Sequence, residues 1–157
     1  MNEKIKSAAS LAKTIARLKK QGKRVVFTNG CFDILHVGHV EYLSRARKMG
    51  DALVIGMNSD SSVRRLKGKD RPINKQKDRA KVLSALSFVD YVVLFNEDTP
   101  EKLIRKLVPD ILVKGADWKK KVVAGVDFVK SRGGKVAFIP FVSGYSTTSL
   151  LEKIARS

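Results

Sequence analysis

The sequence predicts an α/β fold in which five parallel strands form a doubly wound sheet within a single domain. The chain has 157 residues, a usual length for one domain. Five short apolar segments lack the alternation of half-exposed strands, as is typical of strands buried on both faces. Segments with helical spacing of apolar residues separate them, and a repeated β-α order predicts a parallel sheet with helices on both sides.

The chain begins with a predicted helix. Leu11, Ile15 and Leu18 recur at helical spacing, and Gly22 follows as a stop, so we expect an amphipathic helix over residues 8–21. We interpret residues 1–22 as an N-terminal helical extension and residues 23–157 as the domain that carries the function.

Strands and helices then alternate through the first half of that domain. Val25 to Phe27 are the apolar centre of the first strand, and Gly50 closes the helix after it. The predicted elements are, in order, a strand at 23–30, a helix at 39–49, a strand at 52–58, a long polar loop at 59–74, a helix from about residue 74, and a strand at 91–95.

The second half continues the same order. Thr99 as N-cap and Pro100 as the first helical residue begin a helix that Pro109 ends. The remaining predicted elements are a strand at 111–114, a helix at 122–132, a strand at 135–139 and a helix that starts near Ser146 or Thr147.

Composition narrows the function classes. Lys and Arg outnumber Asp and Glu by 32 to 15, so the net charge of +17 predicts a phosphate-bearing partner. The basic residues are dispersed and few aromatic residues stand between them, which weighs against nucleic acid. A single cysteine, Cys31, forms no intrachain disulfide, and a cytoplasmic location fits best. The polar N-terminus lacks a signal-peptide core, and no apolar run reaches the ~20 residues that span a bilayer.

Both histidines of the chain follow the first strand, where doubly wound sheets bind ligands. His36 and His39 are three residues apart at a predicted helix start, so they project on one side, near backbone amides that attract phosphate. Gly38 leaves room for a phosphate, and two imidazoles can stabilise the charge of a five-coordinate phosphorus. The alternatives are two structural histidines, or a metal pair that lacks the usual spacing and supporting ligands.

Three further polar clusters follow other strands. A basic run holds Arg64, Arg65, Lys67, Lys69 and Arg71; such a loop can close over a triphosphate, although a solvated charged surface is the alternative. Before this run, Asn58 and Asp60 are candidates for a sugar or a hydrated metal ion, and Asp60 is also a candidate turn cap. The other two clusters are residues 114–118 and the hydroxyl-rich helix start at residues 144–148, which is also a common N-cap.

The motif GCFDILHVGH resembles the HxGH signature of the cytidylyltransferase-type nucleotidyltransferases. NSD, RLKGKDRPIN, the helix with Arg79, LVKGADW and GYSTTSLLEKI resemble further segments of that superfamily in the same order, over about residues 23–154. The set most closely resembles the adenylyltransferase domains of ADP-heptose synthases. The resemblance implies a Rossmann-like fold and a reaction that joins ATP, with Mg²⁺, to D-glycero-β-D-manno-heptose 1-phosphate, giving ADP-heptose for the lipopolysaccharide core and pyrophosphate. It also implies a homodimer.

The resemblance assigns roles to individual residues. His36 and His39 would stabilise the transition state, and Lys67, or less favoured Lys69, would bridge the reacting phosphates. The implied nucleotide-binding residues are Asn29, Gly30, Cys31, Phe32, Asp33, Gly38, Lys114, Gly115, Asp117, Ser146, Thr147 and Thr148. The implied substrate-binding residues are Asn58, Asp60, Lys69, Arg71, Arg79 and Trp118. No residue is predicted to be a resident metal ligand.

Several of these residues keep a second interpretation. Asp33 would orient the histidine loop, and Cys31 serves as a small turn residue because direct transfer needs no covalent nucleophile. A surface salt bridge is nearly as good an interpretation of Arg79, and loop packing is an equal alternative for Trp118.

Two other functions stay open from the sequence. One is a cytidylyltransferase that acts on a small alcohol phosphate such as glycerol 3-phosphate. The phosphoglycerol enzymes have an arginine shortly before the last motif, where this chain has Phe141-Val142-Ser143, which argues against that activity. The other is a basic nucleic-acid-binding domain, which would show a steep salt dependence of binding and no nucleotide turnover.

Overall fold

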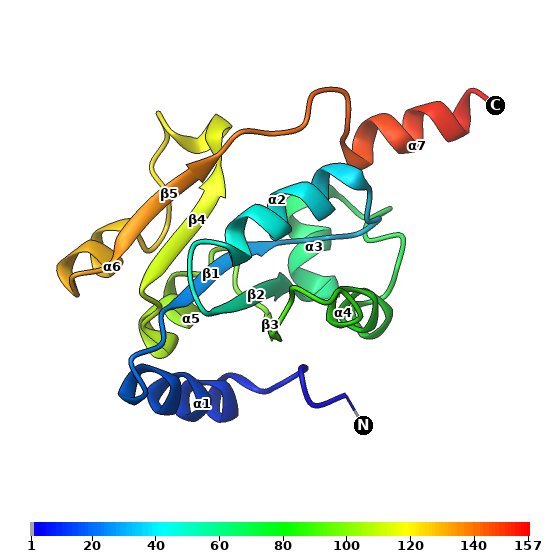
Figure 1. Cartoon of the computed structure of the whole chain (residues 1–157). Coiled ribbons are helices and arrows are strands. Elements are labelled where there is room, and N and C mark those ends of the chain that lie inside the picture. The colour runs from blue at the N-terminus through cyan, green and yellow to red at the C-terminus, as the bar shows by residue number, and fades with distance from the viewer. Residues whose placement is uncertain (1) are drawn as a thin grey trace.

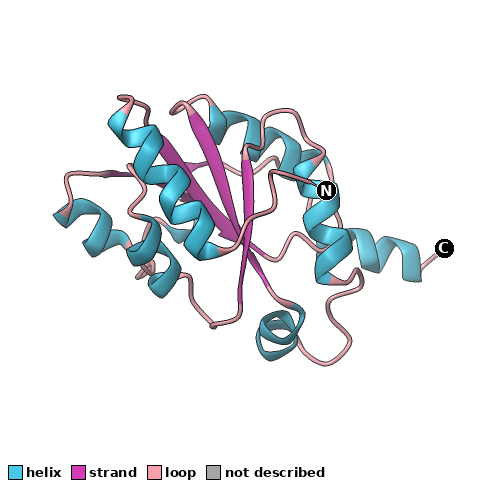
Figure 2. Cartoon of the chain, turned by 90° about the horizontal axis from the view of Figure 1, so that it is seen from below, coloured by secondary structure: helices cyan, strands magenta, loops and turns pink. Residues whose placement is uncertain are grey.

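The computed structural model describes residues 2–157 and shows one parallel five-stranded sheet with helices on both faces (Figures 1 and 2). The strand order is β3-β2-β1-β4-β5, so the order reverses beside the central β1. The bounds are β1 Val25–Gly30, β2 Ala52–Asn58, β3 Tyr91–Phe95, β4 Ile111–Gly115 and β5 Lys135–Ile139. The predicted doubly wound sheet is confirmed.

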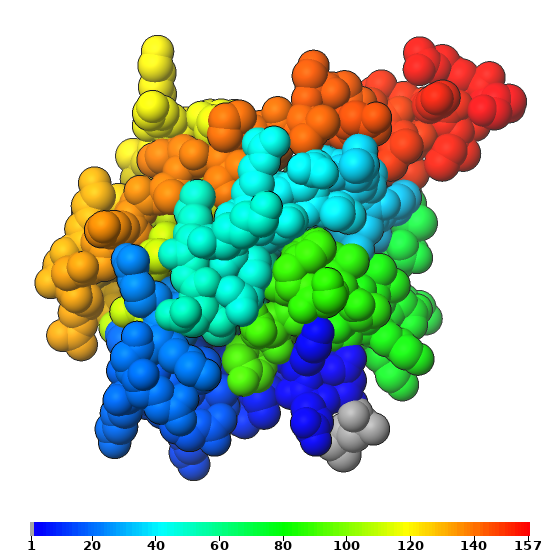
Figure 3. All heavy atoms as spheres, in the orientation of Figure 1, coloured from blue at the N-terminus to red at the C-terminus, as the bar shows by residue number. Residues whose placement is uncertain are grey.

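Helices from different parts of the chain cover the two faces. The first core cluster joins the sheet to α2 and α4, and the second joins it to α1, α5 and α6. Helix α7 extends outward from the body (Figures 1 and 3). The helix bounds are α1 Ala8–Lys20, α2 Val37–Arg47, α3 Asp60–Lys67, α4 Gln76–Ser84, α5 Glu101–Leu107, the 3-10 turn η1 Ala116–Trp118, α6 Val126–Ser131 and α7 Thr147–Ala155.

The strands form because their apolar side chains are buried alternately on both sides. In β1, Val26 packs with the first cluster and Phe27 with the second. Every residue of β2 is buried. Gly56 of β2 lies against the Phe27 ring, and a Cβ there would be 2.7 Å from Phe27 Cζ. Sheet and helices therefore close-pack on both faces.

Four helices differ from the sequence prediction. The region 59–74 is not wholly a loop, because it contains α3, capped by Ser59, whose hydroxyl accepts from the Ser62 amide. Val63 is the buried apolar residue of α3, and one such residue does not produce a recognisable helical periodicity in the sequence. Helix α2 begins earlier, because His36 takes its N-cap. Pro100, not Thr99, is the N-cap of α5, and α6 begins only after Gly125, which has a φ of 87°.

The N-terminal residues pack as part of this body. Leu11 and Ile15 of α1 are 0% and 1% exposed and belong to the second core cluster. Ahead of α1, Ile5 forms a parallel bridge with Val92 at the free edge of β3. The boundary drawn at residue 22 stays a prediction, and α1 shares its core with the sheet. No helix within residues 2–157 has the length and apolar content needed to cross a membrane.

Candidate active site

A cavity of about 780 Å³ lies beyond the carboxyl ends of β1, β2 and β4, at the point where the strand order reverses. It brings together most of the residues predicted from the sequence, which come from all four predicted clusters: Asn29, Gly30, Cys31, Phe32, Asp33, His36, Gly38, His39, Asn58, Lys67, Arg71, Lys114, Gly115, Trp118, Ser146, Thr147 and Thr148. The predicted residues outside its lining are Asp60, Lys69, Arg79 and Asp117.

The two histidines stack on each other at the start of α2. Their ring centroids are 3.9 Å apart, with 27° between the ring planes. His36 Nδ1 accepts from the Gly38 amide at 3.1 Å, and His39 Nδ1 accepts from the His36 amide at 3.4 Å. A neutral imidazole with an accepting Nδ1 carries its proton on Nε2. This reciprocal capping box therefore leaves one Nε2–H donor on each ring for a ligand.

The surroundings keep both rings neutral near pH 7. Burial lowers the pKa of His36. Burial, with a smaller contribution from His36, lowers the pKa of His39 to about 4. Phe32 contributes to this apolar surrounding, with its ring centroid 5.4 Å from that of His39. The pair therefore offers two neutral hydrogen-bond donors, and it can stabilise added negative charge on a phosphate.

Gly38 leaves the space beside the backbone that the His36 ring occupies. A Cβ on Gly38 would be 2.8 Å from His36 Cε1 and 3.2 Å from Tyr145 Cβ.

Phe32 is held at a φ of 49°, which costs a non-glycine residue about 1–2 kcal/mol. Strained backbone of this kind gathers at functional sites, where it holds side chains in place.

The N-terminus of α7 completes the histidine side of the cavity. Thr147 Oγ1 donates to the Ile34 carbonyl at 3.3 Å, and the Tyr145 ring lies 6.3 Å from the His36 ring. Ser146 caps α7 by accepting from the Ser149 amide at 2.9 Å. The segment before α7 runs over the body to reach it (Figure 3). Two helix starts, of α2 and α7, therefore meet at one place that suits phosphate.

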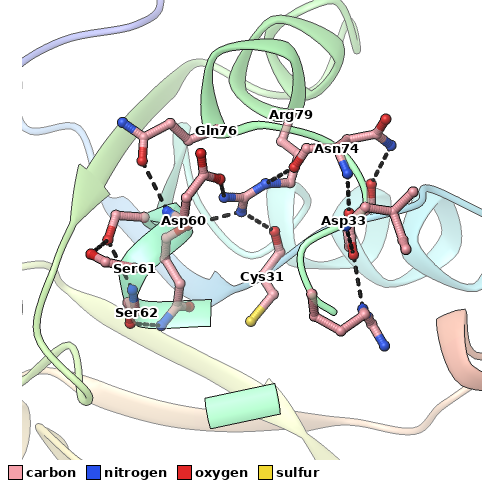
Figure 4. Close-up of polar contacts among 12 residues, drawn as sticks. Cys31, Asp33, Asp60, Ser61, Ser62, Asn74, Gln76 and Arg79 are labelled. Carbon is pink, nitrogen blue, oxygen red and sulfur yellow. Dashed lines mark hydrogen bonds and ion pairs between the residues drawn. The ribbon is translucent and has the colours of Figure 1, made fainter. Parts of the chain in front are cut away.

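Asp33 holds the basic segment against the histidine loop (Figure 4). Its carboxylate accepts from the amides of Ile73 and Asn74 at 2.8 and 2.9 Å and from Arg71 Nε at 2.9 Å. Burial opposes ionisation, but these hydrogen bonds outweigh it and lower the pKa of Asp33. The carboxylate is thus engaged by protein groups, and it fixes where residues 71–74 lie.

Arg79 is buried and donates side-chain hydrogen bonds to four residues (Figure 4). Its guanidinium donates to the carbonyls of Asn74, Cys31 and Asn58 at 2.9, 2.7 and 2.9 Å, and to Asp60 Oδ1 at 2.8 Å. The ion pair with Asp60 is not at the surface, because the Arg79 side chain is 0% exposed. Arg79 therefore ties the ends of β1 and β2 together from beneath the cavity.

Lys114 and Trp118 form the wall at the end of β4. The Lys114 ammonium lies 4.8 Å from the centre of the Trp118 ring, and Lys121 lies 5.1 Å from it. Burial lowers the pKa of Lys114 despite the opposing effect of Asp117. Gly115 lies beside the Phe141 ring, where a Cβ would be 2.5 Å from Phe141 Cζ. This wall offers a cation and flat apolar surfaces.

The basic cluster divides between a helix and a loop. Lys67, the last residue of α3, lines the cavity, whereas Lys69 does not. Arg65 pairs with Asp98 at 2.8 Å. Burial raises the pKa of the Cys31 thiol, and the charge of Lys67 opposes that shift. Among these residues Lys67 and Arg71 bring positive charge to the cavity.

Sequence reasoning missed part of the lining. Tyr42 donates or accepts a hydrogen bond with Thr28 at 2.9 Å, and burial raises its pKa to about 12. The loop after β3 supplies Asp98, Thr99 and Pro100. Ligands bind beyond the carboxyl ends of parallel strands, and this rule could have found these three residues from the sequence. The missed lining residues are Tyr42, Leu66, Asp98, Thr99, Pro100, Val122, Val123, Ala124, Phe141 and Val142, whereas Tyr145 belongs to the predicted cluster at residues 144–148. Residues 2–157 contain no cluster of three or more His, Cys, Asp or Glu that could hold a metal ion.

Comparisons with known proteins show which proteins this chain resembles. Bifunctional protein HldE of Citrifermentans bemidjiense is 56% identical over 156 residues, which is 99% of this chain and 32% of that protein. The HldE of Campylobacter concisus is 60% identical over 151 residues, 96% of this chain and 31% of that protein. The chain thus spans about a third of the length of these relatives.

A solved structure shows the same fold. The lipopolysaccharide core biosynthesis protein from Thermoplasma volcanium GSS1 aligns with a TM-score of 0.62 and 32% identity, over 80% of this chain and all of that one. Residues 27–152 match the family described as cytidylyltransferase-like, and they include both helix starts, the stacked histidines and the basic segment of the cavity. The chain therefore belongs to the cytidylyltransferase-like family.

Proposed function

We propose that this protein is an adenylyltransferase that joins ATP to D-glycero-β-D-manno-heptose 1-phosphate, forming ADP-heptose and pyrophosphate for the lipopolysaccharide core. The stacked pair of neutral histidines, facing the start of α7 in one cavity, carries the proposal. Identity to HldE proteins over nearly the whole chain supports the heptose branch.

The chemistry is a direct in-line displacement. An oxygen of the acceptor phosphate attacks the α-phosphorus of ATP, the bond to the bridging oxygen breaks, and the electron pair leaves with pyrophosphate. Nε2–H of His36 and of His39 donate to the α-phosphate oxygens as their charge grows. Lys67 neutralises the attacking and leaving groups, and the Thr147 and Thr148 region of α7 receives the distal phosphates.

Mg²⁺ enters as part of the substrate MgATP in this proposal. A triphosphate supplies most of the oxygen ligands that Mg²⁺ needs, together with water. The carboxylate of Asp33 is held by Arg71 and two amides, so in this proposal it positions residues 71–74, and the oxygen ligands of Mg²⁺ come from the triphosphate and water.

We also propose that the protein works in the cytoplasm, where ATP is available.

We further propose that the protein works as a homodimer. Helix α7 has no buried residue, and Ile154 on it is 64% exposed, so an apolar surface is available for a second copy. Size-exclusion chromatography coupled to light scattering measures the molar mass directly. A mass of a single chain at micromolar concentration would contradict the dimer.

The test of the function is pyrophosphate release with Mg²⁺ and D-glycero-β-D-manno-heptose 1-phosphate, with ATP and CTP compared in parallel. Mass spectrometry then identifies the sugar nucleotide. We expect release with ATP and formation of ADP-heptose, and a roughly 10²- to 10³-fold loss of kcat in His39→Ala. Release with CTP alone would assign the chain to a cytidylyltransferase, and normal turnover of His39→Ala would defeat the assigned role of the histidine.

A further inference from the structure

Asn29 is the last but one residue of β1, and its side-chain oxygen accepts no hydrogen bond from the part of the chain that the structure describes. Among residues 2–157, its Oδ1 is the buried side-chain polar atom that has no hydrogen-bond partner. Asn29 lines the cavity. A buried polar atom without a partner costs free energy, and native proteins rarely leave one without a reason. A ligand group that pairs with the carboxamide removes that cost.

The side chain of Asn29 lies on the side of the sheet away from the histidine helix. Side chains alternate along a strand. Thr28 contacts Tyr42 of α2 at 2.9 Å, and Phe27 packs in the cluster that contains Leu103 of α5. Asn29 therefore shares the side of Phe27, which faces α5 and α6.

The cavity is lined from both faces of the sheet, because α2 packs in the first core cluster and α5 and α6 pack in the second. One wall holds the starts of α2 and α7, with His36, His39 and Thr147. The other holds Lys67 of α3, Pro100 before α5 and Val123 before α6. In an in-line displacement the attacking oxygen enters opposite the leaving group. When pyrophosphate leaves against α7, the acceptor stands at the wall of α3, α5 and α6, which is the side of Asn29.

We infer that Asn29 determines specificity for the phosphate acceptor, its carboxamide pairing with a hydroxyl group of a polyhydroxylated substrate, and that it does not serve the nucleotide. The inference rests on the proposed function. A hydroxyl group both donates and accepts, so it matches Oδ1 and Nδ2 of one carboxamide together. A site built this way rejects an acceptor without the hydroxyl, because the buried oxygen then stays unpaired.

The test separates the two Michaelis constants. Asn29→Leu keeps the side-chain size and removes hydrogen bonding; Asn29→Asp keeps the shape and removes the donor. Pyrophosphate release is measured with the acceptor varied at saturating ATP and with ATP varied at saturating acceptor. We expect the acceptor KM of Asn29→Leu to rise roughly 10- to 100-fold and the ATP KM to stay within about 2-fold. Should Asn29→Leu not fold, Asn29→Asp carries the same comparison.

Thr28→Ser is the matched control, because it alters the adjacent residue of β1 on the opposite side of the sheet and keeps the hydroxyl that pairs with Tyr42. We expect its acceptor KM to equal that of the wild type. A rise in the ATP KM of the Asn29 variants would place Asn29 in the nucleotide site and overturn the inference. Unchanged constants, or a fall of kcat alone, would overturn it as well.

Monodeoxy forms of the acceptor sharpen the test. For the form that lacks the paired hydroxyl, wild type and Asn29→Leu should show the same acceptor KM, because neither protein can form that hydrogen bond. A variant effect of equal size on every deoxy form would overturn the pairing.

Failure of the proposed function is seen separately, in the wild type. If the wild type does not use heptose 1-phosphate, the same variants are assayed with whichever acceptor it uses from a panel that includes mannose 1-phosphate and glycerol 3-phosphate. Turnover with no member of the panel would overturn both the function and the inference.

Discussion

At the scale of single residues, the histidine pair shows how a helix cap becomes a functional group. His36 and His39 satisfy backbone amides at the start of α2 with their Nδ1 atoms. That capping role fixes the tautomer, so both rings present Nε2–H to the cavity. Under the proposed function, the same two rings therefore serve both the start of α2 and the binding of phosphate.

Gly38 is the residue on which this stacking depends most directly. Gly38→Ala places a Cβ 2.8 Å from His36 Cε1, so the ring must shift. A displacement of about 1 Å at a reacting group can cost roughly 10²-fold, and we expect a loss of kcat of that order. Steady-state pyrophosphate release measures it. Glu41→Ala, at an exposed position of the same helix, is the control, and equal kcat values for the two variants would refute the argument.

The low pKa of His39 predicts a pH dependence of stability. Its folded pKa of about 4 lies below the ordinary 6.5, so the unfolded chain binds the proton more readily between these values. The free energy of unfolding should therefore fall as pH decreases from about 6.5 towards 4, and His36 acts in the same direction. Asp33, with a pKa below its ordinary 3.8, adds its loss only at lower pH.

Urea unfolding at several pH values between about 4.5 and 7.5 measures this change in the free energy of unfolding. That range covers most of the interval between the folded and unfolded pKa of His39. In His39→Asn the curve of unfolding free energy against pH should be flatter than in the wild type. Parallel curves would show that burial of His39 does not set its pKa.

At the scale of elements, α3 changes how the basic segment is interpreted. The sequence predicts a flexible loop, but Arg64, Arg65 and Lys67 lie on a helix whose start is capped by Ser59. A helix presents its residues on different sides, so adjacent charges do not share one role. Lys67 lines the cavity, and Lys69, beyond the helix, does not.

This placement separates the two candidate lysines. Lys67→Met should lower kcat/KM roughly 10²-fold or more, because one charge at the reacting phosphates is lost. Lys69→Met should stay within a few-fold of the wild type. The measurement is pyrophosphate release at several ATP concentrations for both variants. A larger loss in Lys69→Met would mean that the lysines exchange positions when substrate binds, contrary to the present assignment.

At the scale of the whole molecule, the N-terminal helix and the sheet form one packed unit. Leu11 and Ile15 are fully buried among residues of β1, α5 and α6, and residues 4–6 pair with the edge of β3. The edge strand is thereby covered, which limits pairing with other chains. The stability of the site thus depends on residues that lie far from it.

Shortening a buried side chain of α1 tests whether α1 and the sheet share one core. Leu11→Ala should lower the free energy of unfolding by about 2–5 kcal/mol, the usual cost of removing a buried leucine side chain. Urea unfolding followed by circular dichroism measures it, with Lys13→Ala on the same helix as a control for helix propensity. A loss under about 1 kcal/mol would instead support residues 1–22 as a separable extension.

The sequence predicted much of the cavity because its residues follow strands in recognisable clusters. Asn29 to His39 run from the end of β1 through a loop to the first turn of α2, so one short stretch of chain carries many of the lining residues. Arg79 illustrates the limit. Its place under the cavity depends on carbonyl groups of Cys31, Asn58 and Asn74, and the pairing of backbone carbonyls with a distant side chain leaves no pattern in the sequence.

Sequence alone determined the parallel α/β class, the strands and the motifs shared with the family, because apolar periodicity, helix caps and motif residues are local properties of the chain. Tertiary structure decided which helices share a face, that α1 belongs to the core, that Lys67 rather than Lys69 lines the cavity, and that Asn29 and the histidines line the cavity from different faces of the sheet. These depend on contacts between segments distant in the chain, and such contacts follow from packing and burial in three dimensions.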